Sequence, residues 1–405
     1  MNQLNAFSLA VKSLRHKPLT TSINLLLMAI GIAMMSFVLS ASQQLQDGAL
    51  RDAQGIDLVV GAKGSPLQLI LSSVYHIDIP TGNIPLAAQA QLAQNRMVKK
   101  VIPLALGDSY EGFRIVGTTP DYVAHYGGTL TQGKMFEAPL QAVLGAQVAA
   151  RTGLGLGGSF TGAHGLARGG ETHGDAPFTV IGILKPTGTV LDRLVLTPVT
   201  SVWRVHEIEH GIDVNDVQEK AAMDEERELT ALLVQYASPL AAAMLPRMIN
   251  NQTALQAAQP AFESAKLFRI LGVGVDVLRG IAVVMLVSAA LSMFAALYNA
   301  LEERRTDMAI LRTLGAPPMK LLSLLLTEGL ILALAGAAIG WIAGHGALAL
   351  VAGMLAEDQQ FALSGWIVAP DEAWLALIAA GIGIAAALLP AVRAYRTDIA
   401  TTLAH

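Results

Sequence analysis

Residues Asn299–Lys320 read NALEERRTDMAILRTLGAPPMK, a polar stretch between two apolar runs. The first run ends near Tyr298 and the second begins near Leu321, and each is about long enough to cross a bilayer. The sequence therefore predicts a short connector on the membrane surface that joins two spans.

The connector has the pattern of an amphipathic helix. Apolar residues recur at helical spacing at Met308, Leu311 and Leu314, and Gly315 with the prolines that follow predicts the end of the helix. Charges of both signs lie between them, at Glu302, Glu303, Arg304, Arg305, Asp307 and Arg312. One face of the helix is thus free to meet a partner, although a solvated loop that happens to be helical would show the same spacing.

The run EERRTDMAILRTLGA resembles the signature of the FtsX/MacB superfamily of ABC transporter permeases, the four-span type VII class. In that family the segment is the coupling helix, which docks on a separate ATPase subunit. LLLTEG at Leu324–Gly329 resembles the start of the family's third span. The resemblance implies an ATPase contact made here by Glu303, Arg304, Arg305, Asp307, Ile310, Leu311, Arg312, Leu314 and Gly315.

Composition independently indicates a membrane protein. The 405 residues are 53% hydrophobic and only 14% charged, and soluble proteins carry a larger charged share. A net charge of −4 gives no reason to expect a nucleic acid partner. The chain has no cysteine, which excludes disulfides and thiolate metal sites.

We expect four transmembrane helices and a large extracytoplasmic α/β domain with a helical subdomain, inserted between the first and second helices. A cleaved signal peptide is the competing interpretation of the first apolar run, which is too long for one. The expected segments are an amphipathic N-terminal helix (1–21), spans at 22–42, 273–298, 321–350 and 374–392, a MacB-like core domain (43–272), the coupling helix (299–320), a short periplasmic connector (351–373) and a C-terminal tail (393–405).

The distribution of positive charge predicts the orientation. Lysines and arginines flank the first span, fill the central connector and follow the last span, whereas residues 351–373 have none. Because cytoplasmic loops carry the excess of Lys and Arg, both termini and the coupling helix are expected in the cytoplasm of a bacterial inner membrane protein. The large domain is then periplasmic.

Runs rich in β-branched and aliphatic residues predict strands in that domain. These runs are Ile56–Val60, Val98–Leu106, Phe113–Gly117, Phe178–Leu184 and Leu191–Leu196. Helices are expected at Leu86–Asn95, Gln141–Thr152 and Pro198–His206. Glu228–Ala265 is expected to be mostly helical, with turns at its prolines, as the family's helical subdomain would be. The phrases FRIVGTTPDY, AVLGAQVAARTGLGLGG and FTVIGILKPTGTVLDRLVL resemble the MacB-type core domain.

The predicted spans contain two unusual features. Gly336, Gly340 and Gly344 repeat every four residues, which leaves one helix face bare for close packing within a subunit or across a dimer. Glu328 lies inside an apolar run, where it would pair with a polar group of another span, snorkel, or mark the true start of the span. His345 is expected to be a packing residue.

The motifs of nucleotide binding are weak or missing. Gly153–Gly158 fits GxGxxG but follows an expected helix, so we interpret it as a loop. No GxxxxGK[ST] phosphate loop occurs in the sequence. The chain is therefore expected to be no enzyme and to hold no cofactor of its own, with ATP and Mg²⁺ bound by the partner ATPase.

A further hypothesis concerns zinc. His206–His210 fits HExxH, but the motif is short and Gly211 follows it directly, so a polar helix end is the favoured interpretation and a metalloprotease is disfavoured. A glycine-rich loop adds His164, His173 and Asp175. Together with His206 and His210, these side chains would suit a metal site if the loop folded over that helix.

The resemblance implies a permease subunit, as a homodimer with two copies of an ATP-hydrolysing partner. It would couple ATP hydrolysis to conformational change of the periplasmic domain, for export or extraction of a periplasmic or membrane-embedded substrate. A periplasmic adaptor or a lipoprotein is a further expected partner, besides membrane lipid. The alternatives are a transmembrane regulator of a periplasmic enzyme and a metal-linked transport component that uses the periplasmic histidines.

Overall fold

The computed structural model describes residues 6–165, 176–209, 227–304, 313, 317–356 and 363–395. The chain divides into two compact units. The membrane unit comprises Met1–Leu45, Leu271–Met354 and Leu363–His405, and the α/β domain comprises Gln46–Ile270 with Leu355–Ala362. Two long helices, α2 (Pro18–Ala53) and α10 (Pro260–Glu303), are shared between the two units along the chain.

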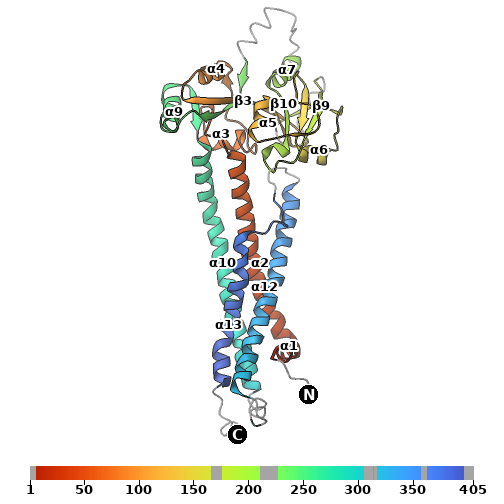
Figure 1. Ribbon diagram of the computed structural model, residues 1–405, viewed down its shortest axis with the longest axis vertical. Helices are drawn as coiled ribbons and strands as arrows, with labels where there is room; N and C mark the ends of the chain where they lie inside the picture. Colours follow the sequence, from red (N-terminus) through yellow and green to blue (C-terminus); the bar gives the residue numbers. More distant parts are fainter. Residues whose placement is uncertain are drawn as a thin grey trace, which may run out of the picture. The chain divides into compact units, whose positions relative to one another are not determined.

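The membrane unit contains a short helix, α1 (Ala6–His16), and the apolar parts of α2, α10, α12 (Pro318–Ala356) and α13 (Ala373–Tyr395) (Figure 1). A 3₁₀ turn, η2 (Pro370–Glu372), leads into α13. Four helices among the described residues are long and apolar enough to cross a membrane, which agrees with the predicted fold class of four membrane helices. Each of α2, α10 and α12 begins at a proline, a residue that favours the first position of a helix.

The first five residues of the predicted coupling helix, Asn299–Glu303, belong to α10 instead. The helix continues through them because its apolar face extends through the buried residues Ala300 and Leu301. Residues 305–312 and 314–316 lie outside the described part of the chain. The predicted helix over those residues therefore stays a prediction.

Small and flexible side chains form the core of the membrane unit. Met28 and Ile32 of α2 pack with Ala289 and Met293 of α10. α12 and α13 contribute a further set of buried residues, Leu332, Ala333, Ala337, Ala379, Ala386 and Ala387. Alanine at these positions lets helix backbones approach closely, which is the usual basis of helix association in lipid.

The α/β domain is built on one mixed sheet, with strand order β13-β1-β12-β3-β4-β10-β6-β9-β5. β3 joins the two halves of the sheet, since residues 98–104 pair with β12 on one side and residues 105–110 pair with β4 on the other. The strands on this path are β1 (Leu58–Ala62), β3 (Val98–Tyr110), β4 (Phe113–Thr118), β5 (Leu130–Gly133), β6 (Gln141–Leu144), β9 (Phe178–Leu184), β10 (Leu194–Pro198), β12 (Ala231–Tyr236) and β13 (Leu255–Ala258). β7 (Ser159–Phe160) joins β9, β8 (Ala163–His164) joins β3, and β2 (Ile84–Pro85) pairs with β11 (Glu228–Leu229).

Short helices pack on this sheet, and separate apolar cores lie between the helices and the sheet. They are α3 (Pro66–Ser73), α4 (Ala87–Ala93), α5 (Pro120–His125), α6 (Ala146–Thr152), η1 (Val190–Arg193), α7 (Val199–Glu209) and α9 (Pro239–Gln252). The order of four membrane helices and an α/β domain between the first two agrees with the predicted fold class. All five predicted strands overlap an observed strand.

Several local predictions are wrong in part. Glu228–Ala265 is helical over only about half of its length, in α9 and at the beginning of α10, and the rest contains β11, the central strand β12 and the edge strand β13, which were not predicted. β12 is buried through Val234, so its run ALLVQY lacks the apolar–polar alternation that would have identified a strand. Gln141–Leu144 is a strand as well, and Pro246 lies inside α9 instead of at a turn.

Candidate functional site

The described part of the predicted ATPase contact is a polar cluster at the end of α10. Glu303 forms an ion pair with Lys17, the residue between α1 and α2. Arg304 donates a hydrogen bond to Ser13 of α1, and its guanidinium lies 3.7 Å from Glu328 of α12. The last turn of α10 is therefore tied to α1, α2 and α12 directly before the predicted coupling segment. The other predicted contacts, from Arg305 to Gly315, lie outside the described residues.

Glu328 is buried, with only 2% of its surface exposed. It forms an ion pair with Arg304, which directly follows α10 in the polar connector. A charge of opposite sign at this distance offsets part of the cost of burying a carboxylate. Glu328 is thus part of the structure that holds the end of α10.

Gly336, Gly340 and Gly344 lie against α2 of the same chain. A Cβ atom on Gly340 would come within 2.4 Å of the Ala29 carbonyl oxygen, and one on Gly344 within 2.7 Å of the Ala33 carbonyl oxygen. A Cβ atom on Gly336 would lie 2.7 Å from Met28 Cβ. The glycine face of α12 therefore brings two helix backbones together within the subunit.

A second polar cluster lies at the opposite end of α12. His345 donates from Nδ1 to the Gly365 carbonyl oxygen at 2.7 Å, and its Nε2 lies 2.7 Å from Glu372 Oε2. Trp341 Nε1 donates to the same carboxylate oxygen at 2.6 Å, and Ser36 Oγ lies at 3.3 Å. Glu372 is buried, and these donors compensate the loss of its hydration. His345 therefore binds the chain before α13, a role beyond the packing role that we expected.

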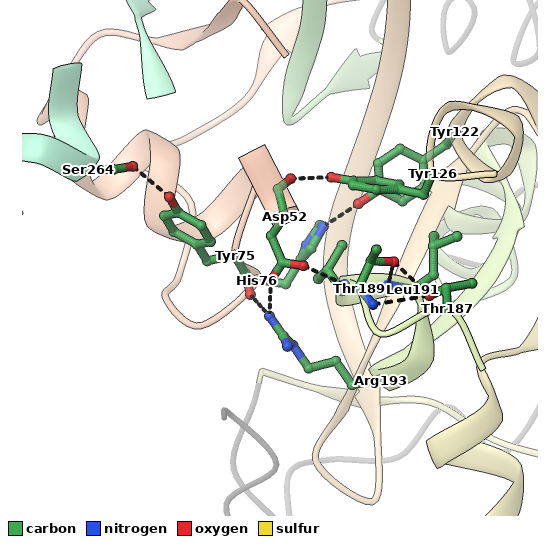
Figure 2. A network of polar contacts seen from close by, with 11 residues as sticks. Asp52, Tyr75, His76, Tyr122, Tyr126, Thr187, Thr189, Leu191, Arg193 and Ser264 are labelled. Carbon is green, nitrogen blue, oxygen red and sulfur yellow. Dashed lines mark hydrogen bonds and ion pairs between the residues drawn. The ribbon is translucent and has the colours of Figure 1, made fainter. Parts of the chain in front are cut away.

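A third network, here called the polar joint, lies in the α/β domain and consists of Asp52, Tyr75, His76, Tyr122, Tyr126, Arg193 and Ser264 (Figure 2). Asp52, in the last turn of α2, accepts a bond from Arg193 Nη2 at 2.8 Å and one from the Val190 backbone at 2.7 Å. Tyr126 donates to the Asp52 carbonyl oxygen at 2.7 Å. The end of α2 is thus bound to η1 and to the residue that follows α5.

The same joint holds the beginning of α10. Arg193 also donates to the carbonyl oxygen of Tyr75, at 3.3 Å, and the Tyr75 hydroxyl hydrogen-bonds to Ser264 of α10. Asp52 and Ser264 are therefore connected through two intervening residues (Figure 2). Ser264 of α10 thus contacts Tyr75 in the short loop that follows α3, and Asp52 of α2 is linked to the same loop through Arg193.

His76 fixes the conformation of that loop. Its backbone has a φ of 55°, in the left-handed region, and its Nε2 lies 2.9 Å from the Tyr122 hydroxyl. Burial, and then the charges of Arg114 and Arg193, hold the pKa of His76 well below its usual value. Arg114 donates to the carbonyl oxygen of Asp78 at 2.7 Å, and burial lowers its pKa to about 10. The loop is thus held by a neutral histidine and a buried arginine.

The candidate zinc ligands are placed only in part. His164 belongs to β8, where its backbone is paired with that of Asp108 in β3, and His206 belongs to α7. His173, Asp175 and His210 lie outside the described residues. Within the described ranges no group of three or more His, Cys, Asp or Glu side chains is placed to hold a metal ion. The zinc hypothesis stays a prediction.

The loop interpretation of Gly153–Gly158 agrees with the structure. Gly153 caps the end of α6 in the left-handed conformation, with a φ of 70°, and the following residues form a turn before β7. The motif therefore precedes no helix that could bind a phosphate.

Sequence reasoning did not find the polar joint or the Glu372 cluster. Each joins residues far apart in the chain, such as Asp52 with Arg193 and His345 with Glu372. The two clusters share one signal in the sequence, an acidic residue at one end of a long helix. These residues are Asp52 in the last turn of α2 and Glu372 directly before α13.

Two family models match the chain. An FtsX-like permease C-terminal model matches residues 279–399, and a MacB-like periplasmic core domain model matches residues 21–245, which is more than half of the 405 residues. No curated protein matches the chain.

Two solved structures resemble it. The periplasmic region of MacB from Actinobacillus actinomycetemcomitans has a TM-score of 0.34 and 14% identity, and the match covers 54% of this chain and 95% of that one. The extracellular domain of the noncanonic ABC-type transporter YknZ from Gram-positive bacteria has a TM-score of 0.31 and 15% identity, with 50% and 99% covered.

Proposed function

Because the chain belongs to the family of FtsX/MacB-type ABC transporter permeases, we propose that it is the subunit that converts ATP hydrolysis by a separate ATPase into movement of its α/β domain. The family implies the ATPase partner. The proposal adds that the segment Arg305–Leu314 is where this partner docks. The chain would act as a homodimer with two ATPase copies, its termini in the cytoplasm and its α/β domain in the periplasm.

One observation carries the proposal, namely the polar cluster at the end of α10. The residues directly before the proposed docking segment are connected to three other helices. Glu303 pairs with Lys17 between α1 and α2, and Arg304 contacts Ser13 of α1 and Glu328 of α12. A force on that segment would thus reach several helices and not α10 alone. Such a movement requires that the ATPase bind two states of the permease with different affinity.

The cargo would be handled on the side of the α/β domain. The described parts of α10 and α13 expose mainly apolar side chains, among them many Val, Ile and Leu residues. This pattern suits helices that face lipid and argues against a hydrophilic pore through one subunit. A lipoprotein, a peptide or an amphiphile, exported or extracted, fits such an arrangement.

The role of the docking segment can be tested by introducing charge into its apolar stripe. The double substitution Leu311→Asp and Leu314→Asp places charge on that stripe, and the ATPase should no longer co-purify with the permease. Thr313→Asp is the matched control, because at about 100° per residue Thr313 lies on the opposite side of the same helix. The control should retain the ATPase at the wild-type level.

The wild type, the double variant and Thr313→Asp must insert into the membrane in equal amounts for the comparison to hold. Retention of the ATPase by the double variant would show that the docking segment is elsewhere. Loss of the ATPase from both variants would mean that the segment does not bind through one face.

A further inference from the structure

The chain before α13 exposes a row of apolar side chains that no described part of the protein covers. Trp366 has 92% of its surface exposed, Ile367 53% and Val368 54%. Trp374, the second residue of α13, is 63% exposed. Large apolar side chains left in water lose the stabilisation that burial would give them, so a contiguous row of them indicates a surface that something else covers.

The backbone of this segment is held firmly, although its side chains are free. Gln44 of α2 forms two bonds with Ser364, to the carbonyl oxygen and from the amide nitrogen, each at 2.9 Å. Ser40 of α2 donates to the Ile367 carbonyl oxygen at 3.1 Å, and His345 of α12 donates to that of Gly365. Gly365 fits closely against α12, since a Cβ atom there would lie 2.6 Å from the His345 carbonyl oxygen.

The position of the segment identifies what covers it. It joins the ends of two membrane spans, α12 and α13, so it lies where those spans leave the bilayer. The exposed apolar surface continues onto both spans, at Leu350 and Met354 of α12 and at Leu377 of α13. Trp is enriched at this depth because its ring prefers the acyl boundary while its N–H reaches the headgroups.

We propose that Trp366, Ile367, Val368 and Trp374 form an interfacial anchor that inserts into the phospholipid surface beside α12 and α13. The bonds from α2 and α12 hold the backbone so that the side chains enter the lipid without losing the fold. The sequence from Val351 to Trp374 has no Lys or Arg. Insertion is therefore driven by apolar contact and not by attraction to anionic headgroups.

The absence of cysteine from the chain allows a direct test on the full-length protein. A nitroxide attached to Val368→Cys is compared with one on Ser159→Cys, an exposed position in β7 of the α/β domain. Oxygen concentrates in the bilayer, whereas a neutral nickel chelate stays in water. The collision rate of the nitroxide with oxygen, divided by its collision rate with the chelate, therefore reports the depth of the nitroxide in the bilayer. In phosphatidylcholine vesicles this ratio should be several-fold higher at position 368 than at 159.

Adding phosphatidylglycerol to the vesicles should leave the ratio at 368 unchanged. Trp366→Ser in the Val368→Cys background should lower it toward the value at 159, and because Trp366 is almost fully exposed the variant should fold. A water-like ratio at 368 would overturn the proposal. Protection from both reagents would overturn it as well, since a second copy or another protein surface would then cover the segment.

Discussion

His76 is the side chain of the polar joint that a proton would disturb most. It is buried, and its pKa is lowered by burial and then by Arg114 and Arg193. The folded state therefore holds His76 neutral, whereas an unfolded histidine takes up a proton below about pH 6.5. The stabilising contribution is complete above that pH and is lost as the pH falls toward the folded pKa.

This predicts that acid weakens the α/β domain through His76. The thermal midpoint of the purified full-length protein should fall between about pH 7.5 and pH 5.5, and His76→Asn should reduce this fall. Within this window, His76 changes the free energy of unfolding by up to about 1.4 kcal/mol per pH unit. Asn accepts the left-handed backbone and cannot titrate. His125→Asn is the control, because the pKa of His125 is also lowered but the side chain is only half buried. Equal pH dependence in wild type and His76→Asn would contradict the assignment.

At the scale of elements, the contact between α12 and α2 depends on the absence of side chains. Gly340→Leu would place a Cβ atom within 2.4 Å of a backbone oxygen of α2, where nothing flexible can yield. Overpacking of this kind costs roughly 1–3 kcal/mol, and here the two helices must separate. We expect a clearly lower thermal midpoint in detergent.

The same helix provides the control for that substitution. A Cβ atom on Gly346 would meet no atom within 4 Å, so Gly346→Leu should leave the midpoint unchanged or raise it. The two variants share their chemistry and their helix and differ only in the face that they occupy. If both lowered the midpoint equally, the close contact between α12 and α2 would be wrong.

At the scale of the whole molecule, the proposed function depends on which side of the membrane each part occupies. Ser159→Cys in the α/β domain should react with an impermeant thiol reagent added to the periplasmic side of intact membranes. Thr306→Cys in the docking segment should react only after permeabilisation. The wild-type chain is the control, since it has no cysteine to label. The reverse pattern would invert the orientation inferred from the positive charges.

Much of the architecture could be predicted from the sequence because membrane spans and amphipathic helices are local patterns. About 20 successive apolar residues suffice to identify a span, and all four were found in this way. The strand β9 was predicted with the bounds that it has, because Phe178–Leu184 is β-branched and ends at a proline-bearing turn. β12 was missed because a strand buried on both faces shows no alternation.

The membrane class, the four spans, the α/β domain between the first two and the glycine face of α12 could all be predicted from local patterns in the sequence. Each of these follows from the composition or spacing of neighbouring residues. The fold was needed to show that this glycine face meets α2, that Asp52 meets Arg193 and that Glu372 meets His345. Residues so far apart in the chain are brought together by the packing of whole helices and strands, and no local pattern encodes which partner a buried charge will find.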